Sequence, residues 1–87
     1  MNSKRRKTLE AIFEEPVPAD ILWADMVKLL EALGATITQG RGSRVRVLLN
    51  GQRAVFHEPH PERTTNKGAV KAMRDFLVNA GVTPETE

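Results

Sequence analysis

The sequence contains no cysteine, and this absence excludes two kinds of stabilising site. Neither disulfide bonds nor zinc sites built on thiolates are available to the chain. A protein without cysteine suits a reducing compartment, and we expect it to act in the cytoplasm. No apolar run approaches the roughly 18 residues that a membrane-spanning helix requires. The basic opening at residues 1–7 is followed by residues 8–15, which are too acidic for the apolar region of a signal peptide.

The length of 87 residues suits one small domain with a single core. The charged residues are unevenly distributed along it. The net charge of +2 is too small by itself to indicate a nucleic-acid partner. However, five arginines fall between positions 41 and 63, whereas six of the eleven carboxylates lie between Glu10 and Glu31. Basic side chains also cluster at Lys4–Lys7 and Lys67–Arg74, so the two signs of charge are segregated along the chain.

The first segment has the spacing of a short helix. Leu9, Ile12 and Phe13 share one side of a helix predicted over Lys4–Glu15, and Pro16 ends it. The alternative is a partly disordered segment. We therefore treat residues 1–19 as a basic N-terminal arm and residues 20–87 as the domain.

Two further segments are predicted as amphipathic helices. For the first of them, Asp20 is the expected cap, Gly34 is the expected stop, and the apolar positions are Trp23, Met26, Val27, Leu30 and Leu33. The last helix is predicted over about Thr65–Ala80, with Gly81 after it and an apolar face made of Ala69, Met73, Phe76, Leu77 and Ala80.

Three short strands are predicted between these helices, at Ala35–Gln39, Arg44–Leu49 and Gln52–His57. Asn50-Gly51 between the last two is the strongest short-range signal of a β-hairpin, because both residues of its turn need positive φ. His57–Asn66 holds two prolines and is predicted to be a loop. The order α-β-β-β-α predicts an α+β sandwich in which two helices cover one face of a three-stranded antiparallel sheet.

A two-residue turn also predicts the hairpin register. The face that must meet the helices carries the pairs Leu49–Gln52, Val47–Ala54 and Val45–Phe56. The other face carries Leu48–Arg53, Arg46–Val55 and Arg44–His57. Every charged side chain of that face is arginine or histidine, and the planar fork of arginine matches phosphate. The alternative is an ordinary solvent-exposed face of an antiparallel sheet, because such faces usually carry polar side chains.

Two other features suit an anion. Lys67, Lys71 and Arg74 share one side of the last helix, which is either an ordinary solvated face or, with the free amides of the first turn, an anion site. Gly40 and Gly42 would let backbone amides approach a phosphate.

The ordered set of motifs resembles the HicA toxin family, small endoribonucleases that pair with HicB-type antitoxins. The resemblance covers about Trp23 to Val82 and leaves out the arm. It is carried by Leu29–Ala35, Gly42-Ser43 before an alternating strand, His60-Pro61 after the third strand, and the ending Lys67–Lys71, Phe76-Leu77 and Ala80–Val82. It implies the α-β-β-β-α fold of double-stranded-RNA-binding domains and an mRNA interferase that is neutralised by a HicB-like antitoxin.

One departure from the family pattern concerns catalysis. The family has a histidine directly after Gly-Ser, held to be catalytic, and Arg44 stands at that position here. RNA cleavage without a metal needs a group that takes the 2′-hydroxyl proton, a group that protonates the leaving oxygen, and positive charge on the phosphate. Arginine supplies only the charge, because a guanidinium keeps its proton, whereas histidine supplies either proton transfer.

The predicted register places His57 across from Arg44. We therefore predict His57 as a catalytic residue with Arg44 on the phosphate; the alternative is that His57 and His60 are ordinary loop-edge histidines. The further candidate RNA contacts are Arg41, Arg46, Arg53, His60, Lys67 and Lys71. A metal site built from His57, Glu58, His60 and Glu62 fits no zinc motif, and we expect no metal and no cofactor.

Two other function classes stay open. A non-catalytic protein of the same fold, which binds RNA or only a partner protein, is favoured by Arg44. A DNA-binding regulator is disfavoured because no helix-turn-helix pattern is present. If an antitoxin binds, we expect its acidic surface to cover Arg44, Arg46, Arg53 and His57.

Overall fold

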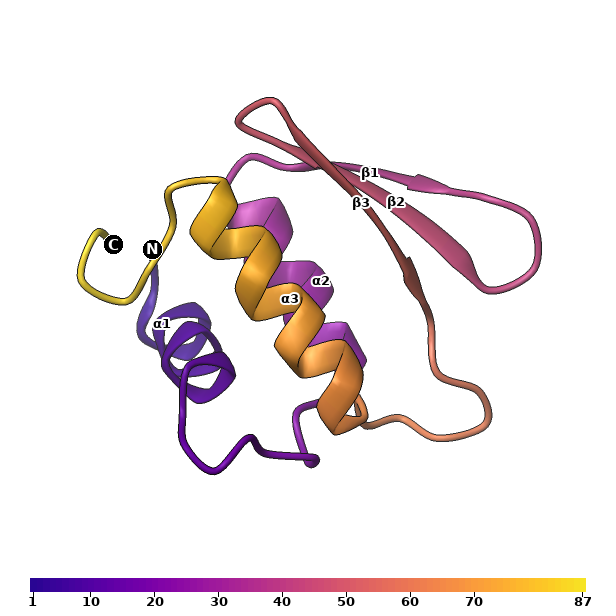
Figure 1. Ribbon diagram of the computed structural model, residues 1–87, viewed down its shortest axis with the longest axis horizontal. Helices are drawn as coiled ribbons and strands as arrows, with labels where there is room; N and C mark the ends of the chain where they lie inside the picture. The colour runs from indigo at the N-terminus through magenta and orange to yellow at the C-terminus, as the bar shows by residue number, and fades with distance from the viewer.

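Two helices, three consecutive strands and a third helix follow one another in the computed structural model, which describes residues 1–87 (Figure 1). The helices are α1 Ser3–Ile12, α2 Trp23–Ala32 and α3 Lys67–Asn79, and the strands are β1 Thr36–Gln39, β2 Arg44–Leu49 and β3 Gln52–His57. The predicted α+β class and the α-β-β-β-α order from α2 to α3 are confirmed. No helix combines the length and apolar character that crossing a membrane would require.

The β2–β3 hairpin has the predicted two-residue turn. Asn50 and Gly51 both have positive φ, 49° and 82°, which glycine and asparagine tolerate best. The register runs from Leu49 opposite Gln52 to Arg44 opposite His57, as predicted. β1 pairs with the other side of β2, so the strand order is β1-β2-β3. The sheet is therefore antiparallel throughout, and alternate residues of β2 point to opposite faces.

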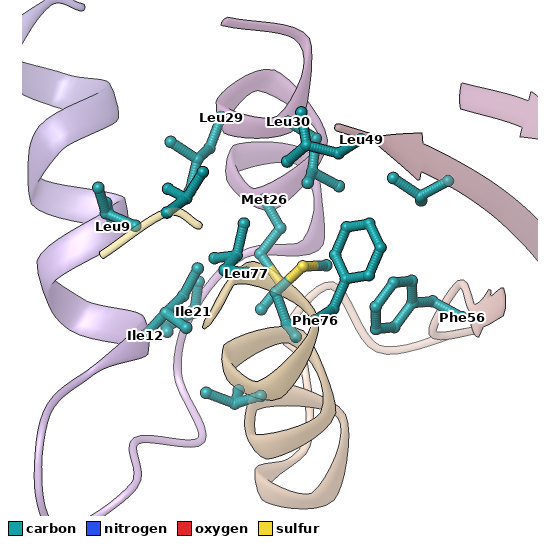
Figure 2. Packing of buried hydrophobic residues seen from close by; sticks show 14 of the residues in the cluster. Leu9, Ile12, Ile21, Met26, Leu29, Leu30, Leu49, Phe56, Phe76 and Leu77 are labelled. Atoms are coloured by element: carbon teal, nitrogen blue, oxygen red, sulfur yellow. The ribbon is translucent and has the colours of Figure 1, made fainter. Parts of the chain in front are cut away.

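The helices form a layer under one face of the sheet, and α1 lies on the far side of α2 and α3 (Figure 1). Figure 2 shows how side chains from these layers meet. The rings of Phe56 on β3 and Phe76 on α3 pack edge to face, with centroids 5.9 Å apart. Leu9 and Ile12 of α1 are fully buried in the same cluster. The apolar spacing in residues 4–15 thus corresponds to a packed helix that ends at Ile12.

The start of α2 differs from the prediction. The helix begins at Trp23, its cap residue is Leu22, and no side chain caps it, so the predicted Asp20 cap is wrong. The reason is a tertiary contact: the Trp23 amide donates to the carbonyl of Arg63 at 2.9 Å, and the Thr65 amide donates to the carbonyl of Ile21 at 2.8 Å. These bonds fix the chain before α2 and leave Asp20 upstream of the helix start.

The last helix also differs in detail. α3 begins after Asn66, whose side chain accepts a hydrogen bond from the Ala69 amide at 2.8 Å. Val70 is buried, whereas Ala69 is only partly buried, so the apolar face is rotated slightly from the predicted one. The helix ends in a Schellman motif in which Gly81 has φ 81° and the Val82 amide donates to the Leu77 carbonyl at 2.8 Å.

Arg74 is turned toward α1 and away from the predicted basic stripe. Its Nε donates to the Ile12 carbonyl at 2.9 Å, one terminal nitrogen donates to the Glu14 carbonyl at 2.8 Å, and the other pairs with the Glu15 carboxylate. Carbonyls at the end of a helix lack hydrogen-bond donors within it, and the Arg74 guanidinium provides the donor for the Ile12 carbonyl at the end of α1. The stripe that the spacing predicted on α3 is therefore reduced to Lys67 and Lys71.

Candidate functional site

The face of the sheet turned away from the helices carries the predicted cluster of cations. Arg44 and Arg46 of β2 and Arg53 and His57 of β3 are all exposed there. The only two ion pairs of the molecule, Arg6–Glu10 and Arg74–Glu15, lie on the helix side. The charge of the three sheet arginines is thus not neutralised by any carboxylate of the chain. We call this surface the arginine face.

Two aliphatic side chains lie among these arginines. Leu48 is 40% exposed and Val55 is 55% exposed. Together with Arg46, Arg53 and two threonines of β1 they line a shallow hollow of about 530 Å³. Sequence reasoning placed both aliphatic residues on this face but assigned them no role. An exposed apolar patch with a charged rim is typical of a protein-binding surface.

One end of the sheet brings Arg44 and His57 together. They are paired residues on neighbouring strands, so their Cβ atoms are about 5 Å apart. The pairing continues one step further, because the Glu58 amide donates to the Ser43 carbonyl at 2.8 Å. The end of the turn before β2 therefore lies beside the start of the loop after β3.

A pocket of about 520 Å³ beside this end is lined by both His57 and His60. We call it the histidine pocket. It lies between the end of β3 and the first turn of α3, and its lining includes Glu58, Glu62 and Asn66. His60 also lines an adjoining depression with Ser43, a residue that the sequence analysis used only as part of the Gly42-Ser43 motif. The structure contains no group of three or more histidine, aspartate or glutamate side chains that could hold a metal ion.

The other predicted contacts lie apart from the arginine face. Arg41 is exposed in the turn before β2, and its carbonyl accepts a hydrogen bond from the Arg44 amide at 3.2 Å. Lys67 and Lys71 are exposed on α3, in the helix layer on the opposite side of the sheet (Figure 1). The Gly40 amide donates to the Arg44 carbonyl at 2.8 Å, so it is not free to bind a phosphate as expected.

A family model described as HicA toxin of bacterial toxin-antitoxin systems matches residues 23–82, more than two thirds of the chain. The chain belongs to the HicA toxin family. The match runs from the first residue of α2 to Val82, so it contains the whole sheet and α3 and leaves out α1. Searches of curated proteins and of solved structures gave no significant match. Membership of a toxin family implies an antitoxin partner.

This HicA family member lacks the histidine that the family pattern has after Gly-Ser. The position is occupied by Arg44, the first residue of β2. Because the strands are in register, His57 lies at the same level on the neighbouring strand. The arrangement brings a guanidinium and an imidazole together on an exposed face, a combination that suits binding a phosphate and moving a proton beside it.

Proposed function

We propose that this HicA toxin is a metal-independent endoribonuclease acting on mRNA, with His57 as a catalytic residue and Arg44 as a ligand of the scissile phosphate. The observation that supports it best is the cross-strand pairing of Arg44 with His57. An imidazole there lies one strand away from the position of the family's histidine. Arg44 contributes charge-assisted hydrogen bonds to phosphate, and His57 contributes proton transfer.

RNA is the proposed ligand of the arginine face. Arg46 lies two residues after Arg44 on the same strand, so their side chains leave the sheet about 7 Å apart and can contact successive phosphates. Arg53 on β3 widens this row of charge. We assign Arg41 and His60 to the same end of the sheet as Arg44, and we propose Lys67 and Lys71 as outer contacts of a longer RNA.

A HicB-like antitoxin is the proposed protein partner, and the cytoplasm is the proposed place of action. Leu48 and Val55 favour a protein ligand at the centre of the arginine face, because aliphatic side chains do not provide the aromatic platforms on which bases stack. Arg46 and Arg53 beside them favour an acidic surface. An antitoxin bound there would cover Arg44 and His57 and exclude RNA.

Incubation of the purified protein with a defined RNA tests the catalytic proposal. The wild-type protein is expected to produce discrete fragments, and His57→Ala is expected to cleave at least about 100-fold more slowly while it still binds RNA. Lys28→Ala, an exposed change on α2, is the control that should leave cleavage unchanged. Variants purified in parallel also reveal any contaminating ribonuclease.

Two results would contradict the proposal. Full activity of His57→Ala would remove this residue from catalysis. If the wild-type protein leaves the RNA intact but shifts its mobility, the protein is a non-catalytic RNA-binding protein. Arg44 in place of histidine favours that function.

A further inference from the structure

The only two histidines of the chain line one pocket. We propose that His60 is the second proton-transfer group of the site, so that His57 and His60 form an acid–base pair that acts on a single phosphodiester. This inference rests on the proposed ribonuclease function and deepens it. It assigns to His60 a role beyond RNA contact. It also explains how the site can carry out both proton transfers although Arg44, and not a histidine, follows Gly42-Ser43.

The chemistry requires two proton-transfer groups. One must accept the proton of the 2′-hydroxyl, and a different one must protonate the departing 5′-oxygen. Arg44 supplies neither, so His57 alone leaves one of the two transfers without a group. The other ionisable groups that face His57 and His60 are the carboxylates of Glu58 and Glu62, whose negative charge repels a phosphate. We therefore infer that the phosphate lies on the Arg44 side of His57.

The loop that carries His60 is held at both ends. The Glu58–Ser43 hydrogen bond fixes its start against the sheet, and the Thr65–Ile21 bond, at 2.8 Å, fixes its end against the segment before α2. Thr65 is almost fully buried. Between these points the prolines at positions 59 and 61 restrict the backbone on both sides of His60. Such anchoring gives the imidazole a defined place in the pocket that His57 also lines, as proton transfer requires.

The position of His60 also suits a substrate that passes over the end of the sheet. His60 lines the histidine pocket and the adjoining depression beside Ser43, so it lies between the two hollows. A nucleotide chain that crosses the end of the sheet can place its phosphodiester toward Arg44, away from Glu58, with the nucleosides on either side of it over the two hollows. The ribose and the leaving nucleotide would then occupy different hollows.

The proposed step consumes no co-reactant. One imidazole removes the proton of the 2′-hydroxyl, and the 2′-oxygen forms a bond to phosphorus. The bond from phosphorus to the 5′-oxygen breaks with its electron pair on that oxygen, and the second imidazole, protonated beforehand, gives its proton to it. The products are a 2′,3′-cyclic phosphate and a 5′-hydroxyl end. One histidine has gained a proton and the other has lost one.

A substrate whose leaving group needs no proton distinguishes the two roles. The linkage that the full-length wild-type protein cleaves is first mapped in an RNA oligonucleotide, and the same oligonucleotide is then made with sulfur in place of the 5′-oxygen at that linkage. On the natural linkage, His57→Ala and His60→Ala should each be slower by about 10²–10⁴-fold. On the sulfur linkage, one of the two variants should come within about 10-fold of the wild type, because a thiolate departs unprotonated. The other variant should stay impaired.

Several outcomes would overturn the inference while leaving the ribonuclease proposal intact. His60→Ala with wild-type activity on the natural linkage would remove His60 from the chemistry, and so would equal impairment of both variants on both linkages. His60→Gln, of similar size, should behave like His60→Ala, and RNA affinity should stay within about threefold of wild type; a parallel loss of affinity would indicate a binding role instead. If the wild-type protein cleaves no RNA, the proposed function itself fails.

Discussion

Arginine takes two different roles in this chain, and position alone decides between them. Arg46 and Arg53 have no carboxylate partner and point to solvent from the sheet. Arg74, by contrast, is surrounded by acceptors from the end of α1, and its guanidinium lies 5.9 Å from the centre of the Phe13 ring. Its side chain is only 18% exposed, and its bond to the Ile12 carbonyl is partly buried, whereas the Glu15 carboxylate is 69% exposed. Arg74 thus stabilises the fold, whereas the sheet arginines are available to a ligand.

Replacing Arg74 with alanine should lower the free energy of unfolding by about 2–3 kcal/mol, because two carbonyls and a carboxylate lose their charged donor. Arg74→Lys should recover only part of this, since one ammonium cannot reach three separate acceptors. Lys71→Ala, an exposed change on the same helix, should stay within about 0.5 kcal/mol of wild type. Urea unfolding measures all three. Equal stabilities of Arg74→Ala and Lys71→Ala would contradict the role assigned to Arg74.

At the scale of elements, the tip of the hairpin is fastened to the end of α3. The Asn50 side chain donates through Nδ2 to the carbonyl of Ala80, at 2.8 Å. Ala80 is the cap residue at the end of α3, where carbonyls lack partners within the helix. Asn50 therefore has two tasks, one in the turn and one between the sheet and the helix layer. The second task fixes how the arginine face sits over the helices.

Two substitutions separate these tasks. Asn50→Gly keeps a residue suited to positive φ and removes only the bond to Ala80, so it should cost about 1 kcal/mol. Asn50→Ala removes the bond and also places an alanine at φ 49°, so it should cost about 1–2 kcal/mol more. Thermal or urea unfolding of both variants gives the difference. If the two variants were equally stable, the turn would not depend on the left-handed conformation of residue 50.

How well each part could be predicted from the sequence depends on how local its cause is. The pairing of Arg44 with His57 follows from Asn50-Gly51, which directly joins the two strands. The cap of α2 could not be predicted, because Ile21 and Trp23 are bonded to a loop 40 or more residues away. The partners of Arg74 are as distant along the chain. His60 was a candidate contact from its motif, but its place in the same pocket as His57 depends on how the loop closes.

At the scale of the whole molecule, the sheet carries charged side chains of one sign only, whereas the helices carry both signs. The three strands contain no aspartate or glutamate, and every carboxylate of the chain lies in a helix, a loop or a terminal segment. A net charge of only +2 therefore coexists with a sheet face on which every charged side chain is a cation or a histidine. Such a face attracts polyanions from a distance, and salt weakens the attraction. It equally suits the acidic surface proposed for the antitoxin.

Charge reversal on this face should weaken binding of both proposed ligands. With Arg46→Glu and Arg53→Glu combined, RNA affinity should fall, and its dependence on salt should become shallower by about 1–2 in log–log slope, as expected for two lost phosphate contacts. Co-purification with the product of the adjacent reading frame, the expected antitoxin, should also be lost. Lys28→Glu on α2 is the control for charge reversal in the helix layer, and it should change neither RNA affinity nor co-purification.

Replacing the two aliphatic side chains of the arginine face, by Leu48→Ser with Val55→Ser, should weaken only the protein complex, because these side chains offer nothing to a phosphate. A protein complex that survives every one of these changes would mean that the antitoxin binds another surface and blocks the toxin from there.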